Sequence, residues 1–336
     1  MWFRGCRLLV VPLAAVLTGG CAIKRLAINS VANSLSASGD TFASDEDPEL
    51  IRDAAPFALK TYEMLLASTP RHPGLLLAAC SGFTQYAYAF VQADADLLGP
   101  DDVEKAAALR ARALKLYLRG RNHCMRALEL RHRGIGTQLM MAPDAAVAAA
   151  TAAEVPLLYW AAAAWGSAIS IGLDRPELVA DFPAVRALME RALALDEGYA
   201  HGALHEVMIT IDGVPEAMGG SVERARSHFE RAVALQGGLS AGPYVALALG
   251  VAVPTQDRAE FERVLNLALA IDPERDPSHR LANLITQRRA RRLLERGDEL
   301  FAAGAGTRLR REPVWRFPAW AFAGSAPWTT QLTEEQ

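Results

Sequence analysis

The chain has 336 residues, of which 51% are hydrophobic, mainly alanine and leucine, and only 7% are aromatic. Unbranched side chains lose little rotamer freedom in a helix, so this composition favours helices over strands. The formal net charge of −3 indicates no general affinity for nucleic acid, and we expect no nucleic-acid partner.

The first 20 residues are typical of an export signal. Two arginines precede a ten-residue apolar run, Leu8 to Leu17, which is shorter than the ~20 residues that a bilayer-spanning helix needs. The sequence LTGGCA follows at 17–22 and resembles the lipobox of bacterial lipoproteins, although Thr18 stands where that motif usually has leucine. We therefore expect a signal peptide over 1–20 and lipidation of Cys21. The alternative is an ordinary secretory signal that is cleaved nearby.

Residues 21–46 are expected to form a flexible tether, because small and polar residues dominate the stretch and leave little to bury. Ala22, rather than an aspartate, follows the lipidated cysteine, which for lipoproteins of this kind indicates the outer membrane, on its periplasmic side. The folded body is expected to begin at Asp47, which can cap a helix, with Pro48 in the first turn.

From residue 48 the sequence predicts helices that are separated by short breaks at proline and glycine, and no stretch shows the alternation of a strand. One helical domain is expected over 47–303. A tail over 304–336 follows it and contains Trp315, Trp320 and Trp328. The predicted helical segments are 48–68, 74–98, 102–132, 155–172, 183–197, 199–212, 221–236, 243–253, 257–272 and 278–302.

Three similar phrases recur in the second half of the chain: MERALALD at 189–196, FERAVALQ at 229–236 and LNLALAID at 265–272. Each carries an apolar stripe at helical spacing and is followed by a break and a second predicted helix. One helix pair cannot bury its stripe alone, so neighbouring pairs must stack. The pattern predicts an all-α fold of stacked helix–turn–helix units like tetratricopeptide (TPR) repeats, in an α-solenoid or helical bundle. The stripes share a small residue, expected at helix–helix contacts, at Ala192, Ala232 and Ala268.

Two cysteines lie inside the predicted helical body, Cys80 and Cys124, 44 residues apart. They could form a disulfide in an oxidising periplasm. We favour the alternative, in which they are two buried thiols that pack as small hydrophobic groups.

Long stretches of the chain resemble a known family. These are PLLYWAAAAWGSAIS (156–170), GGSVERARSHFERAVAL (219–235) and DRAEFERVLNLALAIDPERDPSHRLANLITQRRARRLLERGDELF (257–301), with DPELIRDAAPFALKTYEMLLASTPRHPGLLLAACSGFTQYAYAFV (47–91) upstream. Together they resemble the TatT family, the TPR-containing T components of tripartite ATP-independent periplasmic (TRAP) transporters. The resemblance covers about residues 21–303 and leaves out the tail.

The resemblance implies a lipid-anchored, all-helical periplasmic protein. It also implies a homotrimer that partners the periplasmic solute-binding receptor of a TRAP transporter, and a cleft for an apolar small molecule or lipid within the helical body. A generic envelope TPR scaffold that binds only proteins is the alternative function.

The aromatic residues supply the candidate ligand site. Rings alternate with alanine and glycine on the predicted helices 74–98 and 155–172, which leaves volume beside flat apolar walls. Flexible methionine and a few polar groups would complete a mostly apolar pocket. The expected lining residues are Tyr86, Phe90, Tyr159, Trp160, Trp165, His205, Met208 and Tyr244. The alternative is that these rings simply fill the core.

Signatures of catalysis are absent from the sequence: it has neither a phosphate-binding G-x-x-x-x-G-K-[ST] loop nor a G-x-S-x-G elbow, and we expect no enzyme and no cofactor. One constellation suggests a second alternative. In HGALHE (201–206), His201 and His205 are four apart on one predicted helical face, beside Glu206. A metal-dependent envelope hydrolase would need a third ligand there, so we expect no metal site.

One arginine-rich stretch, RRARR at 288–292, lies in the last predicted helix. Such a stretch is most often a solvated helix face, and the alternative is a docking surface for an acidic partner.

Overall fold

The computed structural model describes residue 30 and residues 39–301. Within that part the secondary structure consists of helices joined by turns and short breaks, and it contains no strand. The predicted all-α class is therefore confirmed. Cys21, the signal segment and the tail over 304–336 lie outside the described residues. The principal helices are α3 (Pro48–Ser68), α4 (Pro73–Tyr86), α5 (Ala93–Leu97), α6 (Val103–Arg131), α9 (Val155–Ile171), α11 (Phe182–Leu195), α12 (Ala203–Asp212), α13 (Val222–Leu235), α14 (Gly242–Leu247), α15 (Arg258–Leu269) and α16 (Arg280–Glu295).

Short helices complete the fold, and most of them were not predicted. The segments α2, α7, α8 and α10 are too short to show a helical period, so only the structure reveals them. The predicted segment 278–302 divides into α16 and α17 at Arg296. The bounds of the short helices are α2 (Gly39–Ala43), α7 (Ile135–Met141), α8 (Pro143–Val147), α10 (Pro176–Val179) and α17 (Gly297–Phe301).

Side-chain caps begin several helices, and the sequence predicted the one at Asp47. The Asp47 carboxylate accepts hydrogen bonds from the backbone amides of Glu49 and Leu50, at 3.0 and 3.1 Å. Ser221 caps α13, and Asp257 caps α15. Because each cap satisfies amides that the first helical turn leaves unpaired, these starts follow from local sequence alone.

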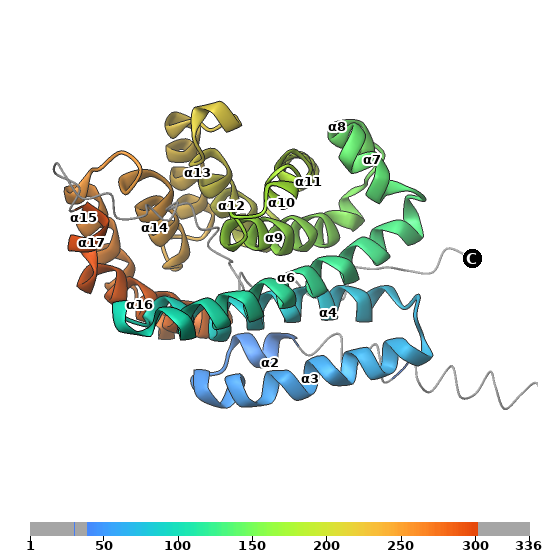
Figure 1. Ribbon diagram of the computed structural model, residues 1–336, viewed down its shortest axis with the longest axis horizontal. Helices are drawn as coiled ribbons and strands as arrows, with labels where there is room; N and C mark the ends of the chain where they lie inside the picture. The colour runs from blue at the N-terminus through green and yellow to red at the C-terminus, as the bar shows by residue number, and fades with distance from the viewer. Residues whose placement is uncertain (1–29, 31–38, 302–336) are drawn as a thin grey trace, which may run out of the picture.

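The helices pack in sequential pairs, as the repeated phrases predicted. In Figure 1, α3, α4 and α6 form one edge of the molecule, and α9 to α13 follow above them. Each phrase helix contacts the helix that follows it: α11 contacts α12, α13 contacts α14, and α15 contacts α16. Contacts of α12 with α13 and of α14 with α15 join neighbouring pairs. The small residues of the three stripes, Ala192, Ala232 and Ala268, are fully buried, which lets the helix backbones approach closely.

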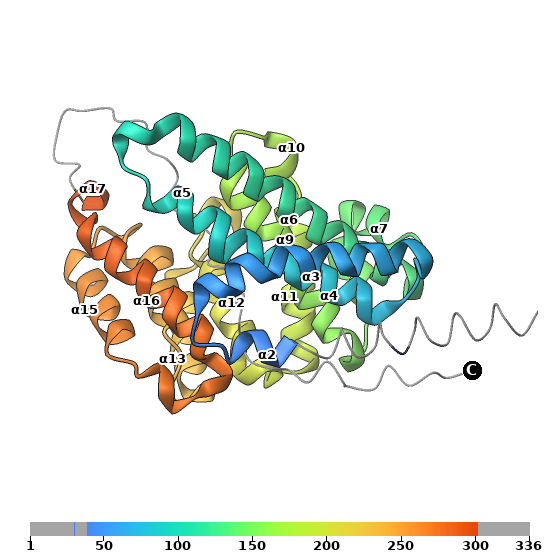
Figure 2. The ribbon, with the colours of Figure 1, turned by 90° about the horizontal axis from the view of Figure 1, so that it is seen from below.

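The last long helix returns to the first ones. Figure 2 shows α16 beside α2 and α3, and the contacts agree. The guanidinium of Arg288 lies 2.9 Å from the Glu49 carboxylate of α3, and Arg292 donates to the carbonyl of Leu97 at 3.0 Å. The arginine stretch 288–292 was interpreted as a solvated face or a docking surface. Arg288 and Arg291 are indeed exposed, and Arg288 and Arg292 in addition join the last long helix to the first part of the helical array.

Two helices contain π-helical turns, at Ala87–Gln92 between α4 and α5 and at Ala248–Ala252 after α14. Such turns are rare and often lie at functional sites.

The continuous segment Pro73–Leu97 is long and apolar enough to span a membrane by composition, but 72% of its apolar window is buried inside the protein. It is therefore a helix of the core.

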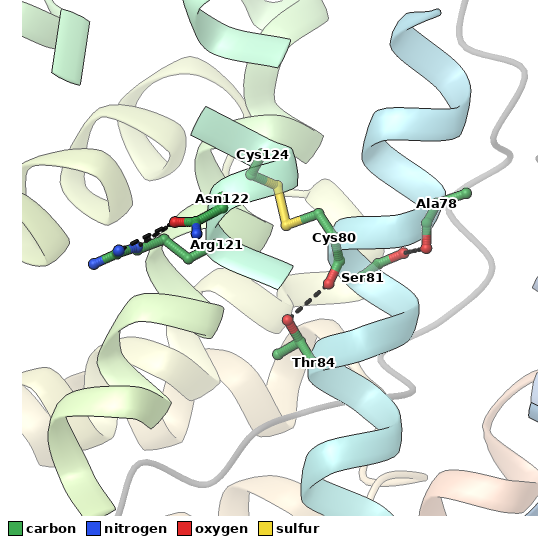
Figure 3. Close-up of a disulfide and its surroundings, with 7 residues drawn as sticks. All are labelled: Ala78, Cys80, Ser81, Thr84, Arg121, Asn122 and Cys124. Carbon is green, nitrogen blue, oxygen red and sulfur yellow. Dashed lines mark hydrogen bonds between the residues drawn. A yellow bond between two sulfur atoms is a disulfide. The ribbon is translucent and has the colours of Figure 1, made fainter. Parts of the chain in front are cut away.

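The cysteines Cys80 and Cys124 form a disulfide that joins α4 to α6, with the Cα atoms 5.4 Å apart (Figure 3). Our preference for two free thiols was therefore wrong. The two helices approach closely beside the bond. A Cβ atom at Gly120 would lie only 2.9 Å from the carbonyl oxygen of Cys80, so a residue with a side chain would not fit there without a shift. Sequence spacing could not decide the pairing, since both states need two buried cysteines.

Candidate functional site

The structure divides the predicted ligand residues among several places. On α9, the rings of Tyr159 and Trp160 lie 5.0 Å apart, and the ring of Tyr199 lies 5.4 Å from that of Tyr159. All three belong to the core or pack against it. His205 and Met208, on α12, are also buried.

Tyr86 and Phe90 form a separate pair, with ring centroids 5.7 Å apart. Each ring is covered by an arginine: Arg112 lies 5.8 Å from the centroid of Tyr86, and Arg52 lies 5.1 Å from that of Phe90. Both rings therefore make cation–π contacts with arginine, an arrangement that the sequence did not predict.

Trp165 and Tyr244 have partners of their own. The Trp165 indole donates to the Asp181 carboxylate at 3.1 Å, and Arg121 lies over its ring at 4.9 Å. Tyr244 packs edge-on against Phe229, with centroids 5.4 Å apart. Whether any of these rings contacts a ligand stays a prediction.

A buried side chain on α12 is an acid. Glu206, on α12, is only 2% exposed, and its carboxylate accepts a hydrogen bond of 3.1 Å from the side-chain amide of Gln236. Burial raises the pKa of Glu206 to about 8, although the bond from Gln236 opposes the shift. Its negative charge is also among the causes that raise the pKa of Tyr88 and Tyr159, so the acid lies within electrostatic range of both hydroxyls.

A second polar cluster lies at the π-helical turn that carries Tyr88. The guanidinium of Arg289 donates to the Tyr88 hydroxyl and lies over that ring, 5.2 Å from its centroid. Nearby, the Tyr117 hydroxyl donates to the side-chain oxygen of Gln92 at 2.6 Å. Burial raises the pKa of both tyrosines, so both hydroxyls stay protonated at neutral pH.

The sequence interpretation did not propose Glu206, Gln236, Tyr88 or Arg289 as ligand residues. One signal was present for Glu206: it is an acid inside the run ALHEVMITID, a helix whose every residue is buried. An acid on such a helix has no solvated face to occupy, so it must be buried with it.

His205 belongs to a chain of polar groups between α12 and α13. Its Nδ1 atom lies 2.8 Å from Nδ1 of His228, and its Nε2 atom lies 3.0 Å from the Glu197 carboxylate. On the far side, Nε2 of His228 lies 3.5 Å from the buried carboxylate of Asp212, which Arg186 also contacts at 2.9 Å. The pairing of His228 with His205 was not predicted from the sequence.

The expectation that His201 and His205 share a helical face was wrong. Ala200 and His201 have left-handed backbone angles, with φ of 46° and 55°, and α12 begins only at Ala203. The His201 ring lies 5.8 Å from that of His279 instead. Within the described part of the chain, no group of three or more His, Cys, Asp or Glu side chains could hold a metal ion.

Comparison with known proteins identifies a family and a relative for this chain. The family model described as "TRAP transporter T-component" matches residues 44–301. The chain is also 30% identical over 310 residues to an uncharacterized protein of Treponema pallidum (strain Nichols), in a match that covers 86% of this chain and 95% of that protein. The family match spans nearly all of the helical body described above, including both polar clusters. The chain therefore belongs to the TRAP transporter T-component family.

Proposed function

We propose that this protein is a lipid-anchored periplasmic T component that binds the solute-binding receptor of a TRAP transporter and holds an apolar ligand within its helical body. The family match over residues 44–301 carries the proposal, because membership of this family implies association with TRAP transporter components. The resemblance noted from the sequence adds the receptor, the ligand and a homotrimeric assembly.

Two further observations support an extracytoplasmic location. The N-terminal segment is typical of an export signal that ends at Cys21. The disulfide between Cys80 and Cys124 is the kind of bond that persists in oxidising compartments such as the periplasm and is rare in the cytosol. We propose the outer membrane as the site of anchoring, since Ala22 follows Cys21.

Native mass spectrometry tests the proposal directly. The purified protein should be measured alone and after mixing with the solute-binding receptor of the same transporter system. We expect a trimer, an added mass from a bound apolar molecule, and a complex with the receptor. A complex with other envelope proteins but never with a receptor, and without bound ligand, would favour the generic TPR scaffold instead.

A further inference from the structure

We propose that Glu206 is the anchor for the headgroup of a bound amphiphile, and that this headgroup is a hydrogen-bond-donating cation such as a primary ammonium. The inference rests on the proposed function, which places an apolar ligand inside the helical body, and it assigns the chemistry of the ligand's polar end.

The first observation is that Glu206 is buried without a counter-ion. Among the described residues, its carboxylate has one hydrogen-bond partner, the Gln236 amide, and no lysine, arginine or histidine nitrogen pairs with it. Burying a carboxylate without a cation is costly, so such a group either stays protonated or takes a cation from outside the chain.

The second observation is that acceptors without donors lie near the acid. The side-chain oxygen of Gln236 is buried without a partner, and it belongs to the same amide that bonds Glu206. The Thr210 hydroxyl, one helical turn after Glu206, is also buried without a partner. An ammonium offers three donors and no acceptor, which matches a carboxylate, an amide oxygen and a hydroxyl.

The third observation is that the backbone makes space for the carboxyl group. A Cβ atom at Gly242, the first residue of α14, would lie 1.7 Å from the Oε1 atom of Glu206. Only glycine permits the carboxyl group to lie there. Helix α12, the end of α13 and the start of α14 therefore meet in one arrangement: the acid, the Gln236 amide, and Gly242, whose missing side chain leaves the room that the carboxyl group occupies.

Aromatic rings favour the same ligand chemistry. Tyr159 lies within electrostatic range of Glu206 and packs against both Trp160 and Tyr199. Aromatic faces attract cations, while their apolar surface suits a hydrocarbon chain. A cationic amphiphile satisfies both features, whereas a fatty-acid carboxylate would meet a like charge whenever Glu206 is ionised.

Binding of a cation should be linked to loss of a proton. Glu206 is largely protonated at neutral pH, and an ammonium beside it would favour the ionised form. The other titratable groups facing the acid are the hydroxyls of Tyr88 and Tyr159, which stay neutral because burial raises the pKa of each. His205, the next residue on α12, is engaged with His228 and Glu197 instead. Affinity for an ammonium should therefore rise with pH as Glu206 ionises.

Three probes of equal chain length test the assignment: dodecylammonium and dodecanoate below their micelle concentrations, and dodecanol below its solubility limit. Isothermal titration calorimetry would use the full chain with Cys21→Ala, which should avoid the need for detergent. We expect dodecylammonium to bind at least tenfold more tightly than the other two at pH 8.5. Its affinity should fall by roughly 25-fold at pH 6.5, because the ionised fraction of an acid with a pKa of about 8 falls by that factor.

Two variants complete the experiment. Glu206→Gln should abolish both the preference for the ammonium and its pH dependence while dodecanol still binds. Glu230→Gln, which changes an exposed acid on α13, should leave both unchanged. Circular dichroism would verify that both variants are folded.

The outcomes separate the two proposals. Equal or tighter binding of dodecanoate, or an ammonium preference that survives Glu206→Gln, would overturn the headgroup assignment and leave the apolar ligand standing. Failure of all three probes to bind the wild-type site would overturn the assignment and count against the apolar ligand as well. Receptor binding, measured separately, is independent of either result.

Discussion

The imidazole rings of His205 and His228 face each other through their Nδ1 atoms, 2.8 Å apart, while the Nε2 atom of each faces a carboxylate. A neutral imidazole carries one proton, so it cannot donate from both nitrogens. A hydrogen bond between the two Nδ1 atoms therefore needs exactly one proton there, and a second proton would turn the contact into a repulsion. The α12–α13 interface is thus sensitive to the protonation of this pair.

We predict that stability falls on acidification and that His228→Leu weakens this dependence. Burial lowers the pKa of His205, and burial together with His205 lowers that of His228. Below the ordinary histidine pKa of about 6.5, the unfolded chain then binds more protons than the folded one, so acid destabilises the fold. Leucine suits position 228 because Leu188 fills the corresponding position in the preceding repeat.

The measurement is the melting temperature between pH 5 and pH 7.5. His201→Asn serves as the control, since asparagine tolerates the left-handed backbone at that position. An identical pH slope in the wild type and His228→Leu would contradict the role assigned to the pair.

Glu206 should act on stability in the opposite direction. Its pKa of about 8 lies above the unfolded value of about 4.5, so between these limits the folded state binds the extra proton. Stability contributed by the protonated acid is therefore lost as pH rises through 8. We expect ligand-free Glu206→Gln to be more stable than wild type at pH 8.5, by a few kcal/mol. Urea denaturation at pH 6 and pH 8.5 checks this, and equal stability of the two proteins at both values would refute it.

The disulfide should contribute substantially to stability. Cys80 and Cys124 close a long loop between α4 and α6, and such bonds commonly stabilise a protein by about 2–4 kcal/mol. Replacement of both cysteines by alanine should lower the unfolding free energy by this amount. A reducing agent should have a similar effect on the wild type and none on the double variant. Because the bond is buried, the reductant is added to the unfolded chain, and equal unfolding free energies of the reduced and oxidised wild type would contradict the expected stabilisation.

Trp165 tests the distinction between core and ligand site. Its ring is 5% exposed and its indole is bonded to Asp181, so we expect a structural role. Trp165→Ala should cost about 3–5 kcal/mol, measured by urea denaturation. A variant that keeps its stability but loses binding of an apolar probe would place Trp165 in the ligand site instead.

The membrane anchor is tested at Cys21. A lipoprotein cysteine carries more than one acyl chain, which stable attachment requires. Cys21→Ala should therefore move the protein from the membrane fraction to the soluble periplasmic fraction. If the variant stays in the membrane fraction, the anchor lies elsewhere, and Cys21→Ser as a second substitution would confirm that result.

Much of the helical body could be predicted from residues that are close together in the chain. The cap at Asp47, the stripe around Ala232 and the break at Pro273 act within one or two helical turns, so the sequence displays them directly. The same locality made 48–68 an accurate helix prediction. It also explains the error at His201, where two left-handed residues interrupt an otherwise helical pattern.

Other features depend on which helices meet, and only the tertiary structure determined them. His205 and His228 are 23 residues apart, and Arg288 is 239 residues from Glu49. Cys80 and Cys124 pair because α4 and α6 pack closely, and Glu206 lies beside Gly242 because α12 meets α14. A hydrophobic stripe determines that a helix face will be buried, but it does not select the partner. The choice of partner depends on the packing of the whole array, because burial is non-directional whereas hydrogen bonds, ion pairs and disulfides require specific geometry.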